Sequence, residues 1–278
     1  MIYPDNFEQK IGFNEIRNML RERCLSTLGK EQVEKMAFSD DAEQVNEWLK
    51  QVREFRRLIL EVEDFPLQYF YDVRESIVRI RIENTHLEEN ELFDLRRSLS
   101  TIDSIVKILN HSDEDESHAE ENDGWRREKK YTYPSLHLLA KDIVTFPQIV
   151  QRIDQILDKF GKIRDNATPE LLQIRRELAK TEGSISRTLY SILRSAQSEG
   201  VVEKDVTPTL RDGRLVIPVI PTLKKKIKGI VHDESATGKT VFIEPTEVVE
   251  ANNRVRELEG EERKEIIRIL TQFTNKLR

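Results

Sequence analysis

The sequence predicts a mainly helical α+β protein: a helical bundle, then a long antiparallel two-helix lever that carries a small β-rich clamp tip. Charged residues make up 35% of the 278 positions and apolar residues only 37%. This balance is typical of amphipathic helices, because each of them buries only one stripe. The ten glycines and nine prolines are too few for an all-β sandwich, which needs many turns. Apolar residues also recur at helical spacing along most of the chain.

The first 165 residues are predicted to form a helical core domain. Cys24 and Trp48 lie on apolar stripes of this region, so we expect both in its core. Apolar spacing predicts helices over residues 7–24, from Asp40 or Asp41 through Phe55, over 71–83 and 87–110, and then over 135–141 and from Pro147 to about Gly161.

Residues 111–130 break this pattern and are predicted to form a charged flexible insertion. The part from 111 to 123 holds seven acids, two histidines and two serines. Four basic residues then reverse the sign of the charge, at positions 126, 127, 129 and 130. Such composition is typical of a solvated loop. A metal site built from His111, His118 and the acids is the alternative, although the spacing fixes no coordination geometry.

Two long helices are predicted in the C-terminal part, an ascending lever helix at 166–200 and a returning one at 246–278. Thr168 is a good N-cap and Pro169 suits the first helical turn. Each helix would be about 45 Å long, and two such narrow apolar stripes favour pairing as an antiparallel coiled coil. The second pattern reaches Arg278 without a stop signal, so we expect a truncated lever and a longer parent protein.

The segment between these helices, residues 201–245, is predicted to be a β-rich clamp tip. Arg214–Pro221 is β-branched and contains Pro218, as in an edge strand. Residues 224–233 and 240–244 also suggest strands, with a glycine-containing turn at 235–239.

Charge is concentrated in this tip. The chain carries a net −6, but residues 211–239 hold seven basic residues against three acids, a net +4, which leaves −10 elsewhere. If residues 224–228 are a strand, Lys224, Lys226 and Lys228 lie on one face about 7 Å apart, close to phosphate spacing. The alternative is a row of solubilising lysines that guards a sheet edge. The residues alone leave both interpretations open.

Several function classes are excluded. One cysteine rules out a disulfide framework and a cysteine-ligated zinc site. No apolar run approaches membrane-spanning length and no leader pattern is visible, so we expect a cytoplasmic protein without membrane contact. The run 236–240, ATGKT, lacks the first P-loop glycine because position 233 is Asp. Residues 232–235 suggest a stabilised turn rather than a catalytic cluster. We therefore expect no catalytic residue, metal or cofactor in this segment.

Two stretches of the tip resemble a known family. Residues 210–219, LRDGRLVIPV, and 228–245, KGIVHDESATGKTVFIEP, are similar to the clamp region of MutS-like proteins, closest to the bacterial type-two MutS paralogues. The resemblance spans nearly the whole chain and is strongest over 210–253. Further matching residues are Phe13, Ile16, Leu20, Cys24, Leu28, Gly29, Lys30, Val248, Val249, Glu250, Asn252 and Asn253.

The resemblance implies the core, lever and clamp regions of a protein in the DNA mismatch repair family. In that family an ATPase domain, which uses ATP and Mg, and a small MutS-related (Smr) nuclease domain follow. Both lie outside this chain, so the parent would be an ATPase and an endonuclease while this fragment is no enzyme. Family members form homodimers and are linked to branched DNA, DNA recombination and, in some cases, stalled ribosomes.

We therefore expect a nucleic-acid-binding fragment whose clamp tip holds a duplex backbone and whose lever helices couple it to the ATPase. The expected partner is double-stranded or branched DNA. Two alternatives stay open: ribosomal RNA or the ribosome as the clamped partner, and an arm that binds proteins. Phosphate contact is assigned on charge alone to Lys224, Lys225, Lys226, Lys228, Arg214 and Lys239.

Overall fold

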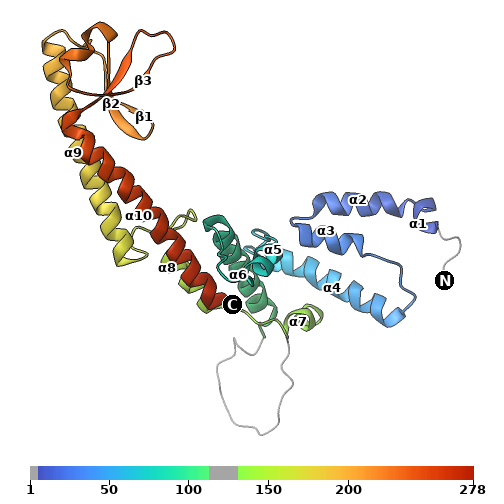
Figure 1. Cartoon of the computed structure of the whole chain (residues 1–278). Helices are drawn as coiled ribbons and strands as arrows, with labels where there is room; N and C mark the ends of the chain where they lie inside the picture. The colour runs from blue at the N-terminus through green and yellow to red at the C-terminus, as the bar shows by residue number, and fades with distance from the viewer. Residues whose placement is uncertain (1–5, 113–130) are drawn as a thin grey trace. The chain divides into compact units, whose positions relative to one another are not determined.

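A computed structural model describes residues 6–112 and 131–278 of the chain (Figure 1). The predicted α+β class is confirmed, because helices dominate and the described residues include a four-stranded antiparallel sheet. The chain divides into two compact units, residues 1–162 with Arg278, and residues 163–277. Most of the predicted insertion, with the alternative metal site that needs His118, falls on residues 113–130 and so lies outside the described residues. The division into core, lever and clamp domains stays a prediction.

The first unit is helical. Gly12, at a φ of 75°, separates two helices where the sequence predicted one. The predicted helix from Pro147 ends at Ile156, earlier than expected. Asp41 caps its helix as predicted, since its Oδ1 accepts from the N–H groups of Glu43 and Gln44. The described helices are α1 (Phe7–Lys10), α2 (Phe13–Arg23), α3 (Thr27–Glu34), α4 (Ala42–Glu61), α5 (Arg74–Arg79), α6 (Glu89–Leu109), α7 (Pro134–Ala140) and α8 (Pro147–Ile156).

The buried core of this unit uses one side of α4. Leu58 is fully buried and packs with Leu109 of α6 and Leu136 of α7. The expected burial of Trp48 is wrong, because its side chain is 45% exposed. Helix α4 contacts the core only near its C-terminal end, so the stripe that contains Trp48 and Val52 faces solvent among the described residues. Cys24 is half-buried, and its Sγ lies 3.3 Å from the Leu20 carbonyl oxygen.

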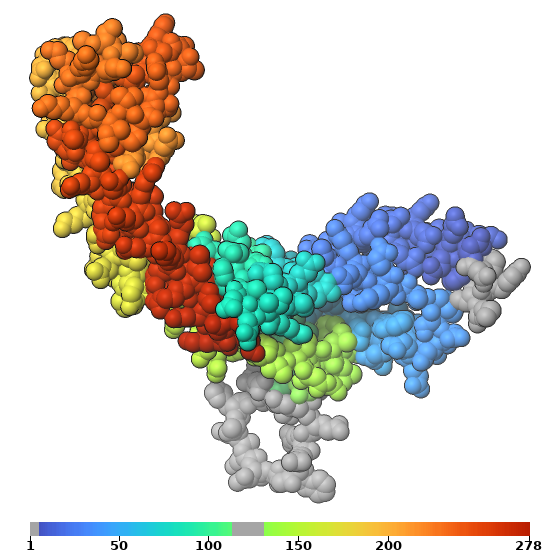
Figure 2. All heavy atoms as spheres, in the orientation of Figure 1, coloured from blue at the N-terminus to red at the C-terminus, as the bar shows by residue number. Residues whose placement is uncertain are grey.

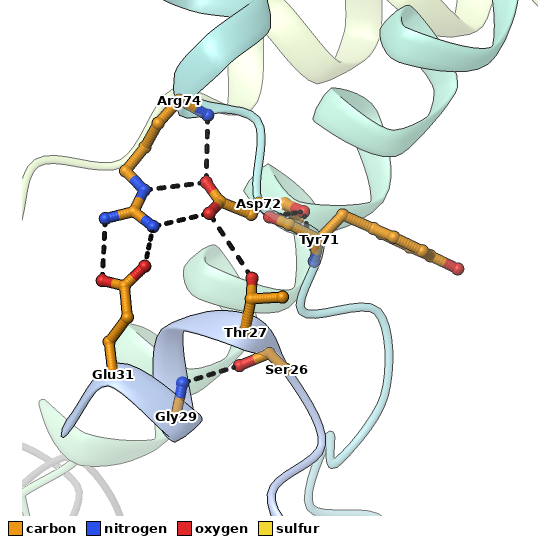
Figure 3. Close-up of polar contacts among 8 residues, drawn as sticks. Ser26, Thr27, Gly29, Glu31, Tyr71, Asp72 and Arg74 are labelled. Carbon is orange, nitrogen blue, oxygen red and sulfur yellow. Dashed lines mark hydrogen bonds and ion pairs between the residues drawn. The ribbon is translucent and has the colours of Figure 1, made fainter. Parts of the chain in front are cut away.

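An exposed ion-pair network ties α3 to the chain that leads into α5 (Figure 3). The Arg74 guanidinium reaches Glu31 with Nη1 3.0 Å from Oε2, and its Nε lies 2.8 Å from Oδ1 of Asp72. Thr27 adds a weak hydrogen bond to Asp72, and Ser26 caps α3 by accepting from the Gly29 N–H. The hydrogen bonds from Arg74 lower the pKa of Asp72 to about 2, so this carboxyl stays ionised at any physiological pH.

The second unit is a two-helix stem that carries a sheet. Helices α9 (Pro169–Ser198) and α10 (Thr246–Leu277) lie side by side. Thr168 bonds Glu265, Arg175 bonds Glu262 and Arg254 bonds Glu177, so partner numbers fall along α10 as they rise along α9. The two helices are therefore antiparallel, as predicted. Thr168 also caps α9 as expected, because its Oγ1 accepts from the Leu171 N–H at 3.1 Å.

Residues 199–245, here called the head, connect the two stem helices in the chain and lie at one end of the stem (Figures 1 and 2). The head contains strands β1 (Thr209–Arg211), β2 (Arg214–Val219), β3 (Gly229–Glu234) and β4 (Val241–Pro245), and a short 3₁₀ helix, η2 (Pro221–Lys226). The strand order is β1-β2-β4-β3, with neighbouring strands antiparallel. One apolar core runs from Leu189 of α9 through Ile217 and Ile243 of the sheet to Val255 of α10.

Residues 214–221 were predicted to form an edge strand. This prediction is wrong, since β2 lies between β1 and β4 in the sheet. Each partner nevertheless covers only half of it. β1 pairs with residues 214–216 and β4 with residues 217–219. Pro218 therefore lies where, among the described strands, β2 has a partner on one side only, which suits a residue that lacks an N–H donor.

Candidate nucleic-acid interface

Five exposed lysines lie on two segments of the head. Lys224, Lys225 and Lys226 end the 3₁₀ helix, and Lys228 follows it just before β3. Lys239 lies in the turn between β3 and β4. All five side chains are exposed, and none forms an ion pair with another residue of the described chain. Their charges are therefore available to an anionic partner.

The strand predicted for residues 224–233 is wrong at its start, because Pro221–Lys226 is a 3₁₀ helix and β3 begins only at Gly229. Pro221 at the first turn favours a helical start, since its fixed φ suits that position and no N–H is lost. With three residues per turn, successive lysines point in three directions about the helix axis. The geometry therefore does not align Lys224 and Lys226 at strand spacing, and the expected 7 Å register of charges is lost.

A cavity of about 610 Å³ lies beside Lys239. Its walls come from the start of the 3₁₀ helix, the end of β2 and the β3–β4 turn, including Pro221, Val219 and Lys239. Val206 and Glu203 of the connection after α9 also line it. Of the five lysines, only Lys239 lines this partly apolar depression, and the start of the 3₁₀ helix lines it through Pro221 and Thr222.

The turn that contains Lys239 is built by Ser235, as the sequence suggested. Its N–H donates to the Thr240 carbonyl at 2.8 Å, and its Oγ accepts from the Thr240 N–H at 3.1 Å. Gly238 has a φ of 66°, which few other residues tolerate. Strand β4 follows directly. A P-loop needs a helix at this point, so this run does not form one.

Arg214 differs from the five lysines. Its side chain is only 14% exposed, its Nη1 lies 2.7 Å from Oε1 of Glu244, and its Nη2 donates to Asn253 at 2.6 Å. Both ends of the guanidinium are thus engaged, one by the buried Glu244 and the other by Asn253 of α10. The phosphate contact assigned to Arg214 from charge stays a prediction, and it would require Arg214 to leave these partners, whereas the five lysines have no ion pair among the described residues.

Glu244 is the centre of this buried network. The carboxylate has no solvent exposure and accepts from Arg214, from Asn252 Nδ2 at 2.7 Å and from His232 Nε2 at 2.5 Å. Burial raises the pKa of the Glu244 carboxyl, but the bonds from Asn252, Arg214 and His232 outweigh it, so the pKa lies below its ordinary value. The network joins β2, β3, β4 and α10.

His232 reaches this carboxylate through a β-bulge. Val231 lies opposite Ile243 and Asp233 opposite Phe242, so His232 is the extra residue in β3. A bulge re-aims a side chain that simple alternation would place elsewhere. The sequence indicated no partner for His232. In the structure its imidazole is a hydrogen-bond partner of the buried Glu244 carboxylate, and it does not lie beside a nucleophile as a base would.

The β1–β2 turn is fastened to α10 by further side chains. Asp212 and Gly213 both have positive φ, 48° and 72°, as a two-residue hairpin requires. Arg256 of α10 donates to the Asp212 carbonyl, and Asn252 Nδ2 lies 3.4 Å from the Leu215 carbonyl oxygen. Sheet and stem are therefore held together by polar contacts as well as by the apolar core.

The role of Glu244 was not predicted from the sequence. One signal was present: a lone carboxylate between Ile243 and Pro245 in a strand whose five residues are all buried. A buried charge needs partners, and Arg214 and His232 are the nearby cationic candidates. Their convergence depends on the strand order and the bulge, which the sequence does not display.

Other site types are not found in the described chain. No group of three or more His, Cys, Asp or Glu side chains among residues 6–112 and 131–278 has a geometry that could hold a metal ion. No described helix combines the length and the apolar character needed to cross a bilayer.

No family profile matches the chain, but many curated proteins do. It is 34% identical over 263 residues to endonuclease MutS2 of a Geobacillus species, 34% over 262 residues to that of Levilactobacillus brevis and 30% over 261 residues to that of Alkaliphilus oremlandii. These matches cover 94–95% of this chain but only 31–32% of each relative. The chain thus spans about a third of the length of the curated relatives it matches.

Proposed function

We propose, on the premise that the chain is similar to endonuclease MutS2 proteins over nearly its whole length, that the head binds the sugar–phosphate backbone of duplex or branched DNA. The observation that carries the proposal is the set of five exposed lysines, without an ion pair among the described residues, on a head that packs on the stem through a shared apolar core. The MutS-like family points to DNA as the partner.

The mode of contact follows from the residue types. Lysine is a flexible point charge, so these side chains suit phosphate oxygens better than base edges. Each phosphate neutralised releases counterions, and affinity should fall steeply with salt. The three lysines of the 3₁₀ helix point in different directions. They therefore suit a backbone that curves around the head, or two strands of a branched molecule, better than one straight backbone.

The stem is proposed to transmit this contact. Helices α9 and α10 are each about 45–48 Å long, and interhelical bonds from Thr168 to Glu265 and from Arg254 to Glu177 hold their antiparallel pairing over the first part of α9. Glu244 links three strands of the head to Asn252 of α10. A movement of the head would therefore move α10. In the longer relatives, this movement is proposed to couple the head to an ATPase domain.

The test is binding of fluorescent duplex and four-way-junction DNA by the full chain across a salt series. We expect log affinity to fall linearly with log salt, with a slope of about −4 for four to five phosphates. A variant with Lys224, Lys225, Lys226 and Lys228 all changed to Glu should bind at least about tenfold more weakly and lose most of that slope.

A control must match the charge change. Exposed lysines of the first unit serve, since changing Lys10, Lys30, Lys35 and Lys141 to Glu alters the net charge equally and breaks no ion pair of the described residues. Equal loss in both variants would mean that net charge alone drives binding. Unchanged binding in the head variant would exclude the head as the contact. A parallel RNA duplex separates DNA from ribosomal RNA as the preferred partner.

A protein-interaction arm is the second candidate, and two observations favour it. The end of β2, the start of the 3₁₀ helix and the β3–β4 turn line a depression with apolar walls, and Ile220, Ile230 and Val231 of the head are each more than 40% exposed. A partner protein that fills this depression would bind with little dependence on salt. The same salt series therefore distinguishes the two candidates.

A further inference from the structure

A strained aromatic loop lies on the first unit, far along the sequence from the head lysines. Tyr69 has a φ of 66°, which is rare for a bulky residue and persists only when the surroundings impose it. Helix α6 supplies that constraint. The Ser98 hydroxyl lies 3.3 Å from the Tyr71 carbonyl oxygen, and Thr101 Oγ1 donates to the Gln68 carbonyl at 3.1 Å.

Arg97 of α6 lies among three aromatic rings. Its guanidinium carbon is 3.9 Å from the ring centre of Phe93, 5.2 Å from that of Tyr69 and 5.1 Å from that of Tyr71. Its Nη1 donates to the Tyr71 hydroxyl at 2.6 Å. Arg97 has no ion pair within 4 Å among the described residues, and its Nε is buried without a hydrogen-bond partner there. The rings are thus backed by a cation that has no ion pair within 4 Å among the described residues, while Asp94 of the same helix interacts with it electrostatically over a longer distance.

The rings remain open to solvent. Tyr69 and Tyr71 lie at an interplanar angle of 23° with ring centres 6.3 Å apart, an offset stack, and Tyr69 is still 49% exposed. Phe160 is 72% exposed. It precedes Gly161, where a Cβ would come within 2.6 Å of the Phe93 ring, so the chain around Phe160 lies tightly against the same cluster.

We propose that Tyr69 and Arg97, with Phe93 and Tyr71 behind them, form a stacking platform for an unpaired nucleobase of a single-stranded nucleic acid. Flat aromatic faces and guanidinium planes are the groups on which unpaired bases stack. A simple packing role would not need a bulky residue at positive φ with half of its surface exposed. This platform is distinct from the lysines of the head and does not depend on them.

A platform for a proline-rich peptide also uses exposed tyrosines, but it needs no cation. The Nε of Arg97, buried without a hydrogen-bond partner among the described residues, and the lack of an ion pair within 4 Å favour a partner that is both flat and anionic. A single-stranded oligonucleotide supplies both properties, since each base is followed by a phosphate.

The experiment compares Tyr69→Gly with the unchanged chain. Glycine accepts positive φ at no steric cost, so this change removes the ring while relieving backbone strain, and the melting temperature should stay equal or rise. The probe is a 12-nucleotide oligo(dT) that carries one 2-aminopurine. We expect Tyr69→Gly to weaken binding about 5- to 150-fold, the range for one stacked base, and to abolish the fluorescence quenching that stacking causes.

Three controls sharpen the comparison. Tyr69→Phe keeps the ring and should bind normally. Tyr190→Ala removes a tyrosine of similar exposure, 46%, from α9 and should have no effect. An abasic oligomer of equal length keeps the phosphates, and Tyr69→Gly should not weaken its binding.

Several outcomes would overturn the inference. They are equal binding of oligo(dT) by Tyr69→Gly and the unchanged chain, an equal loss on the abasic probe, or no binding of oligo(dT) by the unchanged chain. Binding of a polyproline peptide that Tyr69→Gly abolishes, with oligo(dT) unaffected, would also overturn it and assign the platform to protein.

Discussion

The behaviour of Glu244 shows how single side chains hold the head. Its carboxylate has no contact with water, and three donors from different elements surround it. Taking a carboxylate out of water is costly unless partners replace the lost hydration. Arg214, Asn252 and His232 replace it, so the buried charge becomes a fixed junction between the strands and α10.

The low pKa of Glu244 has a definite consequence for stability. A carboxyl with a pKa below its unfolded value of 4.5 stabilises the fold fully above that value. The contribution is lost as the pH falls through the lower pKa of the folded state. The head should therefore weaken in acid and be insensitive to this group at neutral pH.

Glu244→Gln is expected to lower the free energy of unfolding at pH 7 by about 3–5 kcal/mol, because it leaves Arg214 without its buried counter-charge. Urea unfolding measures the change, and the gap to the unchanged chain should narrow in acid. Glu234→Gln, at an exposed position of β3, is the matched control and should change little. A loss below about 0.5 kcal/mol for Glu244→Gln would mean that the network does not stabilise the head.

At the scale of elements, the glycines of the stem helices have open space around them, whereas Gly229 of the sheet does not. Gly183 in α9 and Gly260 in α10 lie in helix interiors, and a Cβ at either site would meet no heavy atom within 4 Å. Glycine weakens a helix because its backbone loses more freedom on folding. Gly229 opens β3, and there a Cβ would collide with the Glu244 carbonyl group. That glycine is required by close approach of the neighbouring strand.

Alanine at these sites should therefore act in opposite directions. Gly183→Ala and Gly260→Ala are each expected to stabilise the chain by about 0.5–1 kcal/mol, whereas Gly229→Ala should destabilise it by about 1–3 kcal/mol through overpacking. Thermal unfolding followed by circular dichroism tests all three. Destabilisation by Gly183→Ala would show that α9 needs flexibility or close contact at that point.

At the scale of the whole molecule, the division into two units predicts separate folding of the second. Residues 163–277 hold a continuous apolar core that includes α9, the sheet and α10. Expressed alone, this segment should be helical and unfold cooperatively, as a unit with its own core does. A disordered spectrum or a broad, non-cooperative transition would contradict the division. If the segment folds, its DNA binding would also test whether the head lysines act without the first unit.

The sequence by itself determined most of the helices, the caps at Asp41 and Thr168 and the pairing of the stem, because local spacing and capping chemistry fix these features. It also determined the MutS2-type resemblance, which rests on contiguous residues of the head. It did not determine the position of Trp48, because exposure depends on which elements cover a helix face.

Only the tertiary structure decided the site. Whether Lys224, Lys225 and Lys226 form a strand or a 3₁₀ turn depended on Pro221 and on where β3 could pair. The roles of Arg214, His232 and Glu244 depended on strand order and on one bulge. These residues are up to 30 positions apart in the chain, and they meet because the assembled head buries one carboxylate whose lost hydration their hydrogen bonds replace. That burial is a property of the assembled head, so no local pattern in the sequence records it.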